Sequence, residues 1–173
     1  MSDAPHIAAV LLAHATDDAV QLQSMVDDLR AISAHPVVVT MAPASIAPAD
    51  VRVVRMQAHA AFITAVRMGM AQLTNTPVQW ALLWTQSATV PGVARLRDLV
   101  AGIPAARSAL VAMEGGDLDT GPVLIGRTAW LELMTVGEAG MSALAARHPV
   151  HRVRYQADVP GGTVAARAPR DIT

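Results

Sequence analysis

Apolar residues along the chain form short, nearly continuous runs that are separated by more polar stretches. The runs cover residues 7–13, 37–40, 51–54, 80–84, 109–113, 123–125 and 153–155. Runs of this length, bounded by polar and turn-forming residues, are typical of strands that are buried on both faces of a sheet. We therefore predict a strand in each of these segments.

Helical periodicity fills most of the intervals between the predicted strands. After the first strand, apolar residues recur every three or four positions, as one apolar helix face requires. These residues are Leu22, Met25, Val26, Leu29 and Ile32. Similar spacing predicts helices near residues 62–73, 93–100, 129–134 and 142–147.

The alternation of strands and helices indicates an α/β fold. We expect a three-layer sandwich, in which helices cover both faces of a mostly parallel mixed sheet. Ligands of such sheets bind outside the carboxyl ends of the strands. The chain has 173 residues, which is enough for one well-buried core, and no linker-like stretch divides it. Residues 1–173 are therefore predicted to form a single domain.

Composition narrows the possible partners and sites. The chain has no cysteine, which excludes disulfides, thiolate metal sites and cysteine nucleophiles. All its basic residues are arginines, they are dispersed, and the net charge is -1, which argues against nucleic acid as a partner. Charged residues make up 16% of the chain, below the roughly 25% of an average soluble domain. We therefore expect a protein partner or a homo-oligomer to cover part of the surface.

The sequence also bears on location in the cell. The first residues lack the basic start of a secretory signal. The uncharged stretch 68–94 is interrupted by prolines and polar residues before it is long enough to span a membrane. We predict a cytoplasmic protein that does not contact a membrane.

Several strings occur in the order in which MobA-like nucleotidyltransferases carry similar ones. Residues 65–71 (AVRMGMA) resemble that family's helix of the form S-L-R-A-G-L-A, and residues 121–127 (GPVLIGR) resemble its G-x-P-V-L-F-G-R segment. Residues 7–13, 137–141 and 168–172 are similar to its first strand, its G-D-x-G-A turn and its closing T-P-E-D-L. The resemblance implies a nucleotidyltransferase fold of the GT-A or Rossmann-like type. It also implies a link to the molybdopterin cofactor, to which such enzymes attach CMP or GMP.

The departures from the family pattern fall on the chemistry of nucleotidyl transfer. That reaction needs amides around a triphosphate, a cation for its oxygens, and carboxylates that hold Mg²⁺. The family supplies the first two with a glycine-rich loop that ends in lysine. Here the same place has Ala13, His14 and Ala15, followed by Asp17 and Asp18, and the chain contains no lysine.

Two positions that the resemblance assigns to metal-binding aspartates carry Gln86 and Arg167. It also implies that the glycine and serine that contact the base have become Ala61 and Ala65. Loss of all these groups predicts that catalysis is no longer maintained. We expect no catalytic residue, metal or cofactor, and a degenerate site for a nucleotide or a phosphorylated small molecule. Its expected residues are Ala13, His14, Ala15, Gln86 and Arg167.

The hypothesis that follows is a binding or scaffold protein in the maturation of the molybdenum cofactor or of an enzyme. The alternative is an active transferase that carries CTP or GTP to a phosphorylated acceptor with relocated Mg²⁺ ligands. Asp117 and Asp119 have the D-x-D spacing by which glycosyltransferases of similar architecture hold a metal-bound sugar nucleotide. The glycine-rich sequence around them equally favours an ordinary turn.

Two further pairs have ordinary structural interpretations. His148 and His151 have no third metal ligand nearby in the sequence, which argues against a metal site. Trp80 and Trp84 share one face of a predicted strand, which is more typical of core residues than of a stacking platform.

Overall fold

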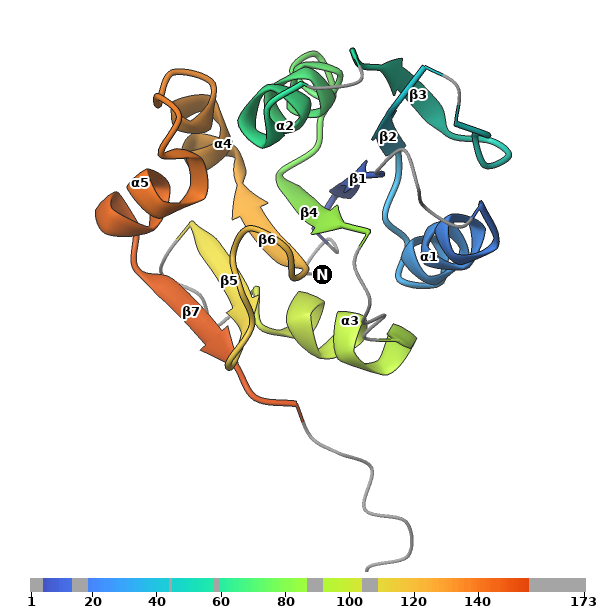
Figure 1. The fold of residues 1–173 in the computed structure, drawn as a ribbon. Coiled ribbons are helices and arrows are strands. Elements are labelled where there is room, and N and C mark those ends of the chain that lie inside the picture. The colour runs from blue at the N-terminus through green and yellow to red at the C-terminus, as the bar shows by residue number, and fades with distance from the viewer. Residues whose placement is uncertain are drawn as a thin grey trace, which may run out of the picture.

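The computed structural model describes residues 5–13, 19–43, 45–57, 60–86, 92–103 and 109–155, which contain seven strands and five helices (Figure 1). The strands are β1 (Ile7–Leu12), β2 (Val37–Met41), β3 (Arg52–Arg55), β4 (Trp80–Thr85), β5 (Leu110–Met113), β6 (Val123–Gly126) and β7 (Val150–Val153). The helices are α1 (Ala19–Ala31), α2 (Phe62–Ala71), α3 (Gly92–Ala101), α4 (Arg127–Leu133) and α5 (Gly140–Arg147). None of these helices is long and apolar enough to cross a membrane.

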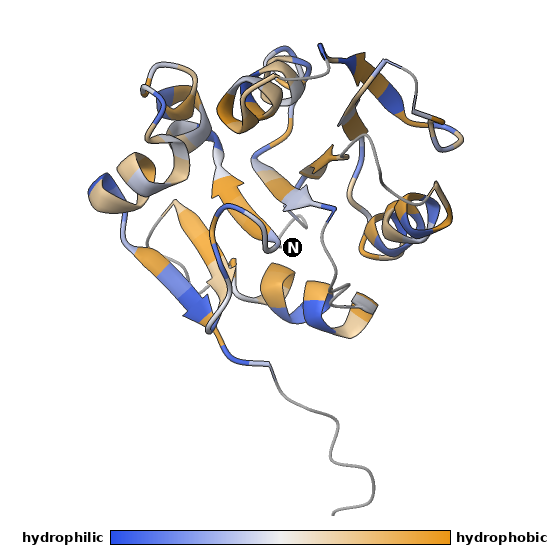
Figure 2. Cartoon of the chain, in the orientation of Figure 1, coloured by the Kyte–Doolittle hydropathy of each residue, from blue (hydrophilic) through white to orange (hydrophobic). Residues whose placement is uncertain are grey.

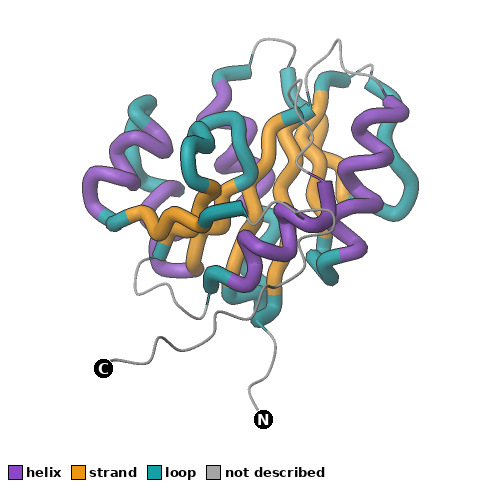
Figure 3. Tube along the Cα trace, turned by 90° about the horizontal axis from the view of Figure 1, so that it is seen from below, coloured by secondary structure: helices purple, strands orange, loops and turns teal. Residues whose placement is uncertain are grey.

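The strands form one sheet in the order β3-β2-β1-β4-β6-β5-β7. Every neighbouring pair is parallel except the two pairs that include β6. Figure 3 shows the strands as a central layer with helices on both sides. The predicted fold class, a three-layer α/β sandwich with a mostly parallel mixed sheet, is therefore confirmed.

Strand β1, in the interior of the sheet, shows how the sequence builds the two cores. All six of its residues are buried. Its odd-numbered residues pack with α1 and α3, and its even-numbered residues pack with α2, α4 and α5. Because successive strand residues point to opposite faces, a continuous apolar run is what a strand between two helical layers requires.

Trp80 and Trp84 belong to the core on the α1 and α3 side. Trp84 is fully buried in the same cluster as Leu82, and the partly buried Trp80 packs against that cluster. Their interpretation as core residues is confirmed.

The last predicted strand, at residues 153–155, was placed too late in the chain. β7 occupies Val150–Val153, with Val150 opposite Leu110 and Val153 opposite Met113, the last residue of β5. Strand pairing therefore ends where its short partner ends. β7 lies at the edge of the sheet and is partly hydrophilic (Figure 2), so an apolar run did not mark it. Tyr155 lies beyond the strand and stacks with Arg95.

Helix α2 approaches the sheet closely at Gly69. A Cβ atom on this buried glycine would overlap Cγ1 of Val10 and lie 3.2 Å from Cγ2 of Thr40. These two side chains belong to β1 and β2, so the missing side chain sets the distance between the helix and the centre of the sheet. Gly69 is the glycine of the AVRMGMA segment.

We expect Gly69→Ala to destabilise the protein by about 1–3 kcal/mol, because the added methyl group must displace packed core atoms. Urea denaturation would measure the change in midpoint at constant slope. Gly137→Ala is the matched control, since a methyl group at that position would meet no described neighbour within 4 Å. Equal stability of the two variants would contradict the close contact.

Candidate functional site

The carboxyl ends of β1 and β4 meet at the point where the chain reverses its direction of travel across the sheet. From β1 the chain proceeds through α1 to β2 on one side, whereas from β3 it returns through α2 to β4 on the other. Such a switch point is where open α/β sheets bind ligands. Ala13 and Gln86 directly follow these two strands, and the backbone N–H of Gln86 donates to the carbonyl of Leu12 at 2.9 Å. The fold thus brings these two predicted site residues to one edge.

Gln86 is buried, with 3% of its surface exposed. Its side-chain Nε2 donates to Oε1 of Gln21 on α1, at 3.2 Å. The side chain is therefore a neutral amide held between the end of β4 and the first helix. Mg²⁺ is bound through charged carboxylates, so an amide in this place supplies no anionic ligand.

Three of the predicted site residues, His14, Ala15 and Arg167, lie outside the described residues. Asp17 and Asp18 lie outside them as well. Their placement at the site stays a prediction.

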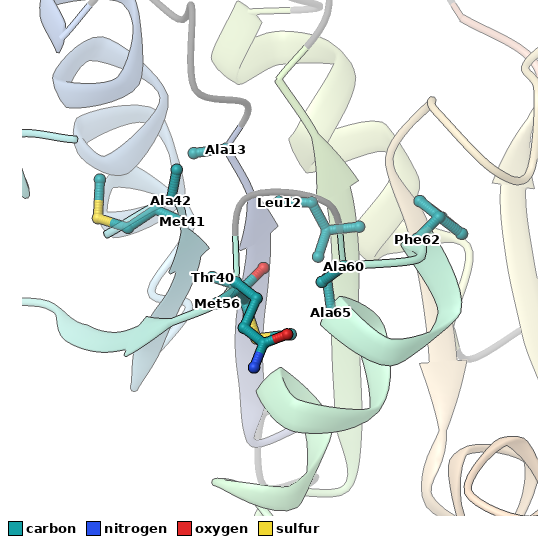
Figure 4. Close-up of a pocket in the computed structure, with 10 residues that line it drawn as sticks. Leu12, Ala13, Thr40, Met41, Ala42, Met56, Ala60, Phe62 and Ala65 are labelled. Atoms are coloured by element: carbon teal, nitrogen blue, oxygen red, sulfur yellow. The ribbon is translucent and has the colours of Figure 1, made fainter. Parts of the chain in front are cut away.

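A cavity of about 160 Å³ lies beside Ala13, at the ends of β1 and β2 and the beginning of α2. We call it the β1 cavity. Figure 4 shows Leu12, Ala60 and Ala65 close together at its centre, with Phe62 to one side. Sequence reasoning missed most of its lining, because Thr40, Met56 and Phe62 come from three separate segments of the chain.

The described lining of the β1 cavity carries no charged residue. Its polar side chains are those of Thr40 and Gln57, and the Thr40 hydroxyl donates to the carbonyl of Leu11 at 3.3 Å. The remaining lining residues are alanine, leucine, methionine and phenylalanine. Such a surface fits a neutral, flat molecule better than a phosphate group.

Arginines near this edge are engaged with backbone carbonyls. Arg55 donates to the carbonyls of Ala42 and Ser45 at 3.0 and 2.6 Å, so it fastens the loop that follows β2. Arg67 donates to the carbonyls of Leu133 and Gly137 at 3.3 and 3.4 Å. These guanidinium groups stabilise loops and helix ends, and neither residue lines the β1 cavity.

Asp117 and Asp119 lie in the turn between β5 and β6. The Asp117 carboxylate accepts from the backbone N–H of Asp119 at 2.9 Å and from the Thr120 hydroxyl at 3.3 Å. Both of its oxygens therefore take part in the turn, as aspartate commonly does. The Thr85 hydroxyl donates to the carbonyl of Asp119 at 3.0 Å and fastens the turn to the end of β4.

The pKa of Asp119 is raised, first because the carboxyl group is partly removed from water and second because the negative charge of Asp117 lies nearby.

His148 pairs with an acidic residue rather than with His151. Its Nε2 lies 3.0 Å from Oε2 of Glu132, whereas His151 stands in β7 opposite Val111. Within the described ranges, no three His, Asp or Glu side chains are grouped so that they could hold a metal ion.

Comparison of the whole chain with solved structures identifies its type of fold. No protein-family model matches the sequence, and no match was found among curated proteins. Rv0371c from Mycobacterium tuberculosis H37Rv, solved in complex with manganese, is 21% identical, with 86% of this chain and 88% of that chain covered and a TM-score of 0.66.

Two enzymes have similar structures. The 4-diphosphocytidyl-2C-methyl-D-erythritol synthase of Anaerococcus prevotii is 8% identical, with 89% of this chain and 90% of that chain covered and a TM-score of 0.62. Glucosyl-3-phosphoglycerate synthase of M. tuberculosis, solved with Mn²⁺ and UDP, is 14% identical, with 87% and 70% covered and a TM-score of 0.63. The chain therefore has a nucleotidyltransferase-like fold, and fold by itself does not establish function.

We expect Gln86→Glu to destabilise the protein by about 2 kcal/mol or more at neutral pH, because it buries a charge. Burial would raise the folded-state pKa of the new carboxyl above the ordinary glutamate value of about 4.3. The free-energy cost of burying the charge is therefore present in full above the raised pKa and decreases as the pH falls through it. Below about pH 4.3 the carboxyl group is neutral in both the folded and the unfolded protein, and this cost vanishes.

Chemical denaturation at several pH values would measure this difference. Gln57→Glu is the matched control, because Gln57 is exposed at the same edge of the sheet. Equal stability of Gln86→Glu and the natural protein at neutral pH would contradict the burial of this side chain.

Proposed function

We propose that this protein binds a small molecule without transferring a nucleotidyl group, and that it serves as a binding or scaffold protein in molybdenum-cofactor or enzyme maturation. The observation that carries the proposal is the environment of Gln86. A neutral amide, buried and hydrogen bonded to Gln21, occupies the end of β4 at the switch point. Metal-assisted phosphoryl chemistry at this point needs a carboxylate instead.

The β1 cavity supports the binding role. It adjoins Ala13 and Ala65, which the resemblance assigns to the phosphate loop and to the base contact. The described residues of its lining are neutral, and with its volume of about 160 Å³ they suit one planar heterocycle. The proposed ligand therefore places an uncharged ring in the β1 cavity, and its affinity does not depend on a divalent cation.

The maturation role rests on the resemblance to MobA-like proteins and on the outer surface of α2 and α4. Arg67 of α2 donates to the carbonyl of Leu133 at the end of α4, so the two helices are neighbours. Each exposes a large apolar residue: Met68 is 44% exposed and Leu131 is 49% exposed. Apolar side chains on adjacent helices support a protein partner or a second copy of the chain.

An active transferase is the second candidate. The bond from Thr85 to the carbonyl of Asp119 places the D-x-D turn next to Gln86, so Asp117 and Asp119 could replace the missing metal ligands. Against this candidate, both Asp117 carboxylate oxygens already accept hydrogen bonds within the turn.

We expect no transfer of CMP or GMP from CTP or GTP to molybdopterin. In calorimetry, cytidine or guanosine should bind at least as tightly as the corresponding triphosphate, and EDTA should not weaken binding. Ala65→Leu should weaken it at least tenfold by filling the β1 cavity, whereas Ala71→Leu, at an exposed position of the same helix, should not. Turnover that a chelator abolishes would refute the proposal.

The pKa of Asp119 distinguishes the two candidates directly. A bound Mg²⁺ would stabilise the charged carboxylate and lower the pKa, so the second candidate requires a downward shift on adding the ion. We expect the carboxyl titration followed by NMR to be unchanged by Mg²⁺. Asp117→Asn is the positive control: it removes the nearby negative charge and should lower the pKa of Asp119.

A further inference from the structure

A second pocket lies at the same edge of the sheet, on the side of α3. Its volume is about 450 Å³, and it is formed by the loop between β5 and β6, by Arg95 of α3 and by Tyr155 after β7. We call it the Arg95 pocket. It shares no lining residue with the β1 cavity, so it is a separate place for a ligand.

The loop that lines the Arg95 pocket is held in a fixed shape. Nη1 of Arg152, on β7, donates to the carbonyls of Met113 and Gly116 at 3.0 and 2.7 Å. The Thr85 hydroxyl holds the far side of the loop through the carbonyl of Asp119. Because these bonds order the loop before any ligand arrives, binding does not have to offset the entropy of ordering it.

The acidic residues of this pocket are already engaged. Oε2 of Glu114 lies 2.9 Å from Nε of Arg154, and the Asp117 carboxylate accepts two bonds within its own turn. Glu114 is thus paired with Arg154, and Asp117 with hydrogen-bond donors of its own turn. Among the charged side chains of the described lining, Arg95 is the one for which no hydrogen-bond or ion-pair partner is found.

Arg95 is positioned by an aromatic ring. Its guanidinium lies over the ring of Tyr155, 4.4 Å from the centroid. Stacking uses the face of the guanidinium and leaves its N–H donors directed outward from its edge. In the part of the chain that the structure describes, no carboxylate or carbonyl accepts from these donors. This contrasts with Arg55, Arg67 and Arg152, whose donors are bonded to carbonyls.

We propose that the Arg95 pocket binds a small organic molecule through one oxyanion, a carboxylate or a phosphomonoester. The planar edge of Arg95 donates two hydrogen bonds to the oxyanion, next to Tyr155 in the same lining. The body of the molecule contacts the apolar part of the lining, which Met113 and Pro122 provide. The inference concerns a different place from the β1 cavity, so it does not depend on the function proposed above.

Three small aromatic probes test the proposal on the full chain: phenyl phosphate, benzoate and the neutral benzyl alcohol. Ligand-observed NMR titration should detect at least one of the two anions, bound at least tenfold more tightly than the alcohol. Preference for the phosphate or for the carboxylate identifies which oxyanion the pocket selects, and either preference supports the proposal. Absence of anion binding up to about 10 mM would overturn it.

Arg95→Gln should weaken binding of the anion at least tenfold and leave the weak binding of benzyl alcohol unchanged. Arg97→Gln is the matched control, because Arg97 is an exposed arginine of the same helix that does not line the pocket. An equal loss of anion affinity in the two variants would show that the anion is attracted by the overall positive charge of α3. That result would overturn the assignment of the oxyanion site to Arg95. Ala65→Leu, which fills the β1 cavity, should leave anion binding intact, so failure of either proposed site can be recognised separately.

Discussion

Strand β1 has no side that faces water, and this burial determines where the protein can carry chemistry. Helices cover both of its faces, and β2 and β4 pair with both of its edges. A polar side chain within the strand would have to be satisfied inside the core. At the end of the strand, the backbone N–H of Gln86 donates to the carbonyl of Leu12, and that of Ala13 donates to the carbonyl of Thr40. Both candidate pockets lie along this edge.

Several arginines of the described residues are bonded to backbone carbonyls, at both edges of the sheet. Arg30, Arg55, Arg127 and Arg152 each donate to two or more backbone carbonyls in loops between strands and helices. A planar guanidinium has several donors and can join carbonyls that a single ammonium group would join less well. These side chains therefore contribute to the stability of the fold.

The two candidate pockets differ in the chemistry that they offer. The β1 cavity has neutral described walls, whereas the Arg95 pocket has one guanidinium whose edge is not bonded to a described acceptor. Thr85 and Gln86 lie between the two pockets, at the end of β4. The Thr85 hydroxyl donates to the loop that lines the Arg95 pocket, and the Gln86 side chain donates to Gln21 of α1. The end of β4 thus carries a neutral amide, where metal-assisted phosphoryl transfer would need a carboxylate.

The sequence by itself determined the order and kind of the elements, because apolar runs and helical spacing report local burial. It also indicated the neutral residue at position 86 and the turn around Asp117, whose hydrogen bonds join residues close in the sequence. It misplaced β7, since pairing with β5 rather than hydrophobicity sets the bounds of an edge strand.

Only the tertiary structure decided which distant side chains meet. Arg127 donates to carbonyls about fifty residues away, and Arg95 stacks on Tyr155 from a different element. No periodicity in the chain encodes such pairs, because they depend on how helices and loops pack around the finished sheet. For the same reason, the neutral β1 cavity and the Arg95 pocket could be found only after the strands had been placed in register.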